Sequence, residues 1–184
     1  MVYSKAVPVI LIGFTLACGG GKDAQPASEK TSVAGKTGTS AADLPDPCKL
    51  ATDKEISDLL WRGMETGQVD PMRARKAEWI ITSRVENVEM PAGRTCYYQH
   101  KLVAHDTTWS EGDFKLRTLA RPTFDIFAQS SPSKQQPIPG VGDQAFYMSN
   151  AAYGRRGDVG IEVVEFSSKD LEIELLKAAV ARLP

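Results

Sequence analysis

Apolar residues recur at the spacing of an amphipathic helix in three segments of the chain. The clearest covers residues 53–62, where Ile56, Leu59 and Leu60 form one apolar stripe. Thr52 precedes this stripe as an N-cap, and Glu55 stands where a capping box requires it. The other two predicted helices are a short one that opens at Pro122 and carries Phe124 and Phe127, and a final one that starts at Ser167 or Ser168 and carries Ile173, Leu176, Val180 and Leu183 on one stripe.

Five further segments predict strands, and two of them, residues 79–86 and 114–118, alternate apolar and polar residues as half-buried strands do. In the first of them, Trp79, Ile81 and Val85 share one parity. The predicted strands lie at residues 79–86, 94–103, 114–118, 145–148 and 159–166. Strands with one polar face are typical of antiparallel sheets. The order of the elements therefore predicts an α+β fold, an antiparallel sheet of about five strands with helices packed on one face.

Two segments that contain glycine predict turns. In Gly140–Asp143 the glycines permit a tight backbone and the aspartate caps it locally, so we favour a structural role. Residues 154–158 predict a hairpin turn, because Gly and Asp tolerate the required backbone angles. The same segment contains the adhesion tripeptide Arg156-Gly157-Asp158, and we favour the turn over adhesion.

The N-terminal residues have the pattern of a signal for export. Residues 6–17 carry no charge and follow Lys5, but they are too few to span a bilayer, which needs about 20 apolar residues. Thr15-Leu16-Ala17-Cys18 then resembles the bacterial lipoprotein signal, although Thr15 stands where that signal prefers leucine. The alternative is an ordinary cleaved signal followed by an incidental cysteine.

The lipoprotein resemblance implies cleavage after residue 17 and acylation of Cys18. Acyl chains such as palmitate would then anchor the protein in a lipid bilayer. Gly19 in place of aspartate implies the outer membrane if the cell has two membranes.

Residues 18–46 lack the apolar side chains that a folded core needs. Val33 and Leu44 are their only large aliphatic residues, and they include no aromatic residue. We predict a flexible linker with a reach of about 30 Å, from the length scaling of unfolded chains. The predicted organisation is a signal peptide over residues 1–17, the acylated cysteine and linker over residues 18–46, and a single globular α+β domain over residues 47–184.

The charged residues are nearly balanced. The chain has 22 Lys and Arg against 23 Asp and Glu, which gives a formal net charge of −1 at pH 7. Binding of nucleic acid relies on a basic excess, so we expect no nucleic-acid partner. Arg73, Arg75 and Lys76 form one small basic cluster, for which we favour a solvated loop over a surface for an anionic lipid or a protein.

With Cys18 acylated, Cys48 and Cys96 remain, and in an exported domain they most simply form one disulfide. The loop it closes would contribute up to about 4 kcal/mol in the chain-entropy treatment. The alternatives are two free thiols, or a thiol nucleophile beside a histidine.

A metal site is the other chemistry that these residue types suggest. Cys96, His100, His105 and Asp106 are the only cluster of metal-ligand types in the sequence. On one strand, however, Cys96 and His100 would be roughly 13 Å apart, too far to bind one ion together. We therefore expect no metal and no cofactor, with His100 facing the core and hydrogen-bonded to a partner, and His105 in solvent. The sequence also contains no G-x-S-x-G signature of a serine nucleophile, and we expect no enzymatic activity.

Three stretches together resemble a group of small bacterial envelope lipoproteins. They are D-P-C-K-L-A-T-D-K-E-I-S-D-L-L from Asp46 to Leu60, the pair Cys96-Tyr97, and P-G-V-G-D-Q-A-F-Y from Pro139 to Tyr147. The resemblance covers residues 46–183, but residues 63–94 have no counterpart in it. It implies an α+β fold and a disulfide between Cys48 and Cys96, and it implies no activity.

These observations favour a membrane-anchored lipoprotein of the cell envelope that acts as a non-catalytic binding module for a protein partner or an envelope ligand. The alternatives are a structural or assembly factor of an envelope complex, and a small hydrolase or thiol-redox protein. Trp61, Tyr97, Tyr98 and Trp109 are candidates to line a binding site, although we favour core packing for them.

Overall fold

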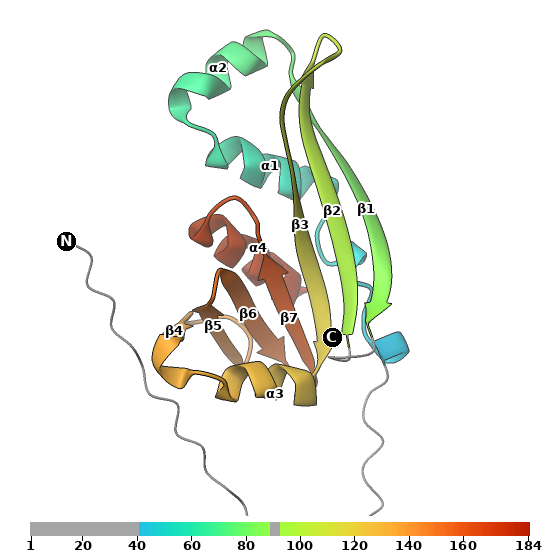
Figure 1. Cartoon of the computed structure of the whole chain (residues 1–184), viewed down its shortest axis with the longest axis vertical. Coiled ribbons are helices and arrows are strands. Elements are labelled where there is room, and N and C mark those ends of the chain that lie inside the picture. The colour runs from blue at the N-terminus through green and yellow to red at the C-terminus, as the bar shows by residue number, and fades with distance from the viewer. Residues whose placement is uncertain (1–40, 89–92) are drawn as a thin grey trace, which may run out of the picture. The chain divides into compact units, whose positions relative to one another are not determined.

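A computed structural model of the chain describes residues 41–88 and 93–184. Within them, seven strands form one antiparallel sheet with the order β1-β2-β3-β7-β6-β5-β4 (Figure 1). The strands are β1 (Glu78–Val88), β2 (Gly93–Ala104), β3 (Thr107–Ala120), β4 (Gln136–Pro137), β5 (Gln144–Met148), β6 (Ala151–Arg156) and β7 (Val159–Val164). The predicted α+β class with an antiparallel sheet is confirmed.

The helices are close to the predicted ones, with one addition. They are α1 (Asp53–Gly63), α2 (Thr66–Ala74), α3 (Arg121–Gln129) and α4 (Lys169–Ala181), with short 3-10 turns η1 (Ala41–Asp43), η2 (Pro47–Lys49) and η3 (Pro132–Lys134). Three of the helices were predicted, whereas α2 was not.

The sheet has seven strands in the described residues rather than about five, because β4 and β6 were not predicted. Strand β6 has the sequence A-A-Y-G-R-R, which contains no β-branched residue and no clear alternation. It is connected to β5 by Ser149 and Asn150, whose φ angles are +51° and +60°. The hairpin turn predicted at residues 154–158 is shorter than expected, since β6 extends to Arg156.

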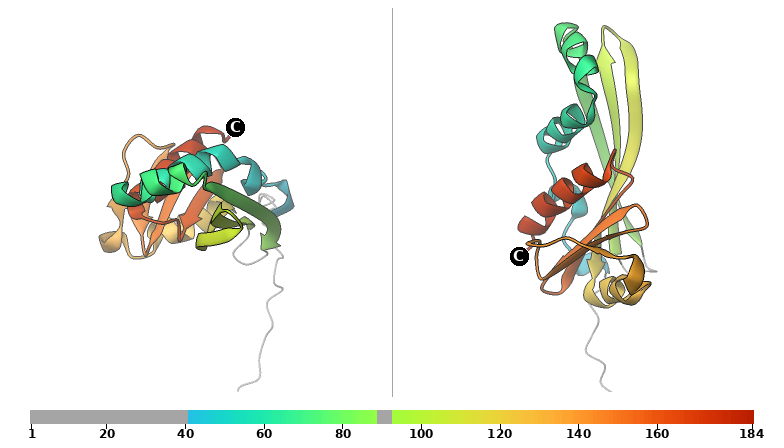
Figure 2. Two further views of the ribbon diagram at one scale, coloured as in Figure 1. Left: turned by 90° about the horizontal axis from the view of Figure 1, so that it is seen from above. Right: turned by 90° about the vertical axis from the view of Figure 1, so that its left-hand side faces the viewer.

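The helices do not all lie on one face of the sheet, which corrects the predicted packing. Helices α1, α2 and α4 lie on one side, while α3 lies against the other side of the β5–β7 part (Figure 2). Neighbouring residues of β5 show the division, because Ala145 packs into the core under α4 and Phe146 packs with Phe124 of α3. Both faces of this part of the sheet are therefore covered, and its strands do not alternate as clearly as β1.

The main core lies between the sheet and helices α1 and α4. The predicted stripe of α1, which is Ile56, Leu59 and Leu60, is buried in it. The capping box also forms, since the amide of Glu55 donates to Thr52 Oγ1 at 3.2 Å and the amide of Thr52 donates to Glu55 Oε2 at 2.9 Å. Helix α4 begins after Ser168, as predicted, and buries Leu171, Leu175, Leu176, Ala179 and Val180.

The segment before α1 is fastened to the sheet. A disulfide joins Cys48 of η2 to Cys96 of β2, with a Cα–Cα distance of 5.2 Å, so the predicted pairing is confirmed. Leu44 is only 2% exposed, and its carbonyl oxygen accepts a hydrogen bond from Arg94. The packed part of the chain therefore includes residues just before Pro47, where we placed the end of the linker.

None of the described helices is long and apolar enough to cross a membrane.

Candidate functional site

A cleft lies between α2 and strands β1–β3. Helix α2 lies beside the end of the sheet at which a turn joins β2 to β3 (Figure 1). Its volume is about 480 Å³. The lining residues are Met64, Gly67, Gln68, Pro71, Met72, Trp79, Leu102, Trp109 and Ser110. None of them is charged, and most are apolar or aromatic. We call this feature the α2 cleft, and its size and lining are those of sites that bind small organic ligands.

All three tryptophans of the chain gather at this cleft. Trp79 and Trp109 line it, and the ring of Trp61 meets the ring of Trp79 edge to face, with centroids 6.1 Å apart. Trp109 is 45% exposed, which is unusual for so large an apolar side chain. The preference for core packing of Trp61 and Trp109 thus holds only in part, because both are incompletely buried at the edge of a cleft.

The indole nitrogen of Trp79 is buried and has no hydrogen-bond partner among the described residues. An indole N–H is a donor only, and leaving it unpaired in a buried place has a cost in free energy. The ring of His100 lies 5.4 Å from that of Trp79, and its Nδ1 atom is likewise buried without a partner in the described part of the chain. Both atoms are out of reach of solvent, so neither is open to a ligand in the α2 cleft.

His100 occupies a space that Gly112 leaves open. A Cβ atom at residue 112 would lie 2.9 Å from the His100 ring, so only glycine fits there without displacement of the ring. Burial lowers the pKa of His100, and the negative charge of Asp113 opposes this effect in part. The imidazole is therefore neutral at pH 7, and it faces Trp79 as an uncharged ring. The prediction that His100 lies in the core holds for its partly buried ring, but not for the expected hydrogen-bond partner.

Two arginines stand at the margin of the α2 cleft. The guanidinium of Arg73 lies 5.5 Å from the ring centre of Trp61, and that of Arg75 lies 4.8 Å from the ring centre of Trp109. Within the described residues neither arginine has a carboxylate within ion-pair distance. The basic cluster was predicted as a solvated loop. All three residues are exposed, as predicted, but Arg73 lies in the last turn of α2, and Arg75 connects the end of α2 to the β2–β3 hairpin by a cation–π contact.

Helix α2 forms although its sequence, T-G-Q-V-D-P-M-R-A, carries weak helical signals. Gly67 and Pro71 both disfavour a helix, and Glu65 makes no side-chain cap at the N-terminus. The helix ends where Lys76 takes a φ of +55° and the amide of Ala77 donates to the carbonyl of Met72. Met72 and Met64 then pack near Leu102 and Trp79, so tertiary contacts hold the helix in place.

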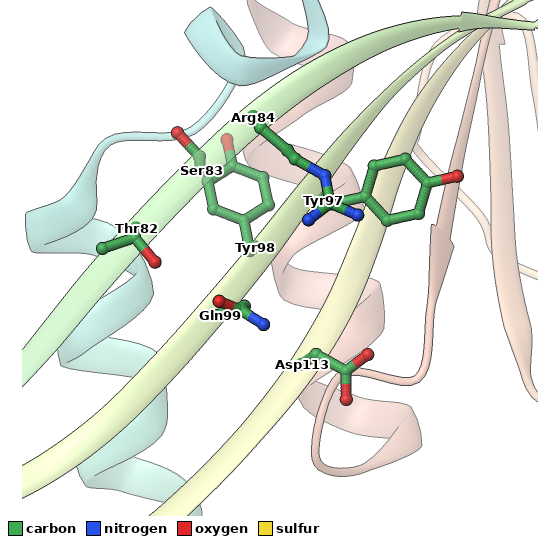
Figure 3. A pocket seen from close by; sticks show the side chains of 7 residues that line it. All are labelled: Thr82, Ser83, Arg84, Tyr97, Tyr98, Gln99 and Asp113. Atoms are coloured by element: carbon green, nitrogen blue, oxygen red, sulfur yellow. The ribbon is translucent and has the colours of Figure 1, made fainter.

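A second depression lies over β1, β2 and β3 and is shown in Figure 3. It has a volume of about 170 Å³ and is bordered mainly by polar side chains, among them Thr82, Gln99 and Asp113. Arg84 lies over the ring of Tyr97 here, and it also pairs with Glu86 at 3.0 Å. Tyr98 belongs to the core instead, where its hydroxyl donates to the carbonyl of Cys48 at 3.4 Å. This depression is smaller than the α2 cleft, and its arginine is already paired.

The other candidate metal ligands, Cys96, His105 and Asp106, occupy positions that the fold explains. Cys96 is held in the disulfide, while His105 and Asp106 form the exposed two-residue turn between β2 and β3, with φ angles of +49° and +63°. Groups of three or more His, Cys, Asp and Glu that could hold a metal ion do not occur in residues 41–88 and 93–184.

The Gly140–Asp143 turn is tied to the Arg156-Gly157-Asp158 turn. The carboxylate of Asp143 accepts a hydrogen bond from the amide of Gly157 at 2.8 Å and lies 3.4 Å from the guanidinium of Arg155. The amide of Asp143 donates to the carbonyl of Arg155 at 2.7 Å. These contacts support a structural role for both segments. Cys18, Gly19 and the signal peptide lie outside the described residues.

Comparisons with known proteins do not extend these observations, because no protein-family model, no curated protein and no solved structure matches the chain. The resemblance to envelope lipoproteins stays a prediction from the sequence.

Proposed function

We propose that this protein is a lipid-anchored binding module of the bacterial cell envelope, and that the α2 cleft is its ligand-binding site. The anchor is the acylated Cys18 that the sequence predicts. The observation that carries the binding site is the α2 cleft itself, an open cavity of about 480 Å³ whose lining residues carry no charge. Trp79 and Trp109 line it, and aromatic and apolar linings are typical of ligand-binding sites.

The chemistry around the cleft favours binding over catalysis. Its lining contains no nucleophile beside an acid or base that could activate it. Cys48 and Cys96 are held in a disulfide. Rigid aromatic side chains supply much of its surface. Such side chains give large contact area at little loss of conformational freedom.

Native mass spectrometry of the full-length protein, extracted from membranes in mild detergent, tests the proposal. We expect a bound species of defined mass on the protein. Ser110→Phe should abolish it, because residue 110 lines the cleft and a ring there fills the space. Thr108→Phe is the matched control on the same strand, since Thr108 pairs with Val103 and does not line the cleft.

A protein that carries no bound species would contradict the binding proposal, as would a bound species that survives Ser110→Phe. Both variants should retain the disulfide, which the intact mass reports through the two missing hydrogen atoms.

A further inference from the structure

We infer that the ligand of the α2 cleft is a single-chain anionic lipid, whose acyl chain fills the cleft and whose headgroup meets Arg73 and Arg75. This inference rests on the proposed function, because it names the ligand class of the same site. Two features of the cleft carry it, namely its apolar lining and the cations at its margin.

The lining suits a flexible hydrocarbon chain. Met64 and Met72 come from the segment around α2, while Leu102 comes from β2. Methionine side chains are unbranched and adapt to irregular apolar shapes. The volume of about 480 Å³ lies within the range of about 300–1,000 Å³ that is usual for ligand pockets, so one acyl chain can enter but a folded partner cannot.

The charges at the margin select an anion. Arg73 and Arg75 are exposed, and within the described residues they contact tryptophan faces rather than carboxylates. Their N–H groups are therefore available to a phosphate or carboxylate, which arginine binds through paired hydrogen bonds. The flat face of a guanidinium group contacts the indole, and its N–H edge binds the anion. One arginine can therefore make both contacts at once. A lipid with a cationic headgroup would be repelled here.

The ligand is thus expected to carry one hydrocarbon chain and a negative charge at the head of that chain.

The test adds defined probes to the full-length protein in non-ionic detergent and follows bound mass by native mass spectrometry. Lauroyl lysophosphatidate, which has an acyl ester and a phosphate, should bind at one equivalent. Dodecyltrimethylammonium has a similar chain with a cationic head and should bind at least about tenfold more weakly, as expected from charge complementarity. Glycerol phosphate, which lacks the chain, should not bind.

Variants locate the headgroup and the acyl chain. Arg75→Gln should weaken the lysophosphatidate about tenfold, since the lost contact is a hydrogen bond to a charged group. Arg84→Gln is the matched control, because Arg84 also lies over an aromatic ring but belongs to the other depression. Ser110→Phe, which fills the cleft, should abolish binding of the lysophosphatidate.

Equal binding of the cationic and anionic probes would overturn the inference, as would loss of affinity in Arg84→Gln to the same extent as in Arg75→Gln. Absence of lysophosphatidate binding would also overturn it. If a bound species sensitive to Ser110→Phe were then still present on the membrane-extracted protein, the proposed binding function would stand with another ligand class, such as an apolar peptide side chain.

Discussion

Gly142 and Gly140 stand in the same turn, and both have a positive φ, +55° and +73°. A Cβ atom at residue 142 would lie 2.2 Å from the carbonyl oxygen of Arg155, whereas one at residue 140 would meet nothing within 4 Å. We expect Gly140→Ala to lower the free energy of unfolding by about 1 kcal/mol, from the backbone angle alone. Gly142→Ala should cost at least about 2–3 kcal/mol, because the backbone of β6 must also move. Urea unfolding of the two variants measures the difference, and equal losses would show that the turn does not depend on this close approach.

Glu55 links the start of α1 to the end of α4, since its carboxylate accepts from the amide of Thr52 and pairs with Arg182 at 2.5 Å. The hydrogen bond from Arg182, and next the one from the amide of Thr52, lower the pKa of Glu55 from its ordinary 4.5 to about 2. The stability that this carboxylate supplies is therefore present above pH 4.5 and is lost as the pH falls through about 2.

From these contacts we expect Glu55→Gln to lower the free energy of unfolding by about 1 kcal/mol at pH 7, a value already reduced for solvent screening of a pair that is one-third exposed. The difference from the natural protein should shrink as the pH approaches 2. Chemical unfolding at pH 7, 4 and 2.5 measures it, and a difference that stays constant over this range would mean that the ionised carboxylate contributes nothing.

Single residues were predictable where a local rule governs them. The capping box of Thr52 and Glu55 depends on three-residue spacing, and the Cys48–Cys96 pair was what remained once Cys18 had been set aside. His100 and Trp79 illustrate the opposite case. The sequence pattern placed each of them on one face of its own strand, but whether each finds a hydrogen-bond partner depends on neighbours from α1, α2 and β3 that no local pattern identifies.

Among the elements, α2 was missed because its own sequence opposes it. Gly67 and Pro71 weaken the helix, and it forms through contacts with residues that are distant in sequence, such as Trp109. Strand β6 was missed for a related reason, since β5 and β7 on either side determine its pairing more than its own composition does. By contrast, the apolar stripe and the capping box of α1 both favour a helix at the same place, so α1 was predicted nearly to the residue.

The same contrast predicts unequal stability of the two helices. Amide hydrogens of α2 should exchange faster than those of α1, because α2 has fewer buried side chains. Arg75→Ala removes the contact between α2 and Trp109, and it should speed exchange in α2 by about twofold to fivefold, the factor that corresponds to a cation–π contact of about 0.5–1 kcal/mol. Hydrogen exchange with mass spectrometry resolves this by peptide, with Arg84→Ala as the control. Unchanged exchange in α2 would show that Arg75 does not hold the helix.

For the molecule as a whole, the α2 cleft and the sequence resemblance fall on different segments. The stretches that resemble envelope lipoproteins contribute α1, the centre of β2 and the turn before β5, all of which build the core. Most of the cleft comes instead from residues 64–79, within the segment that has no counterpart in the resemblance, and from Leu102, Trp109 and Ser110. The α2 cleft, the candidate binding site, therefore lies mostly in a segment that the resemblance does not describe.

The proposed role also requires that this site be delivered to a membrane, which tests the predicted anchor. We expect the full-length protein to sediment with membranes and Cys18→Ser to be released from them, because acylation needs the thiol of residue 18. Cys48→Ser is the matched control, since it removes a cysteine of the disulfide and should leave the protein membrane-bound though less stable, by up to about 4 kcal/mol. Membrane fractionation with intact mass measurement reports both the location and the acyl chains. A Cys18→Ser variant that stays on the membrane would mean that another feature holds the protein there, and an unacylated natural protein would remove the lipid anchor from the proposal.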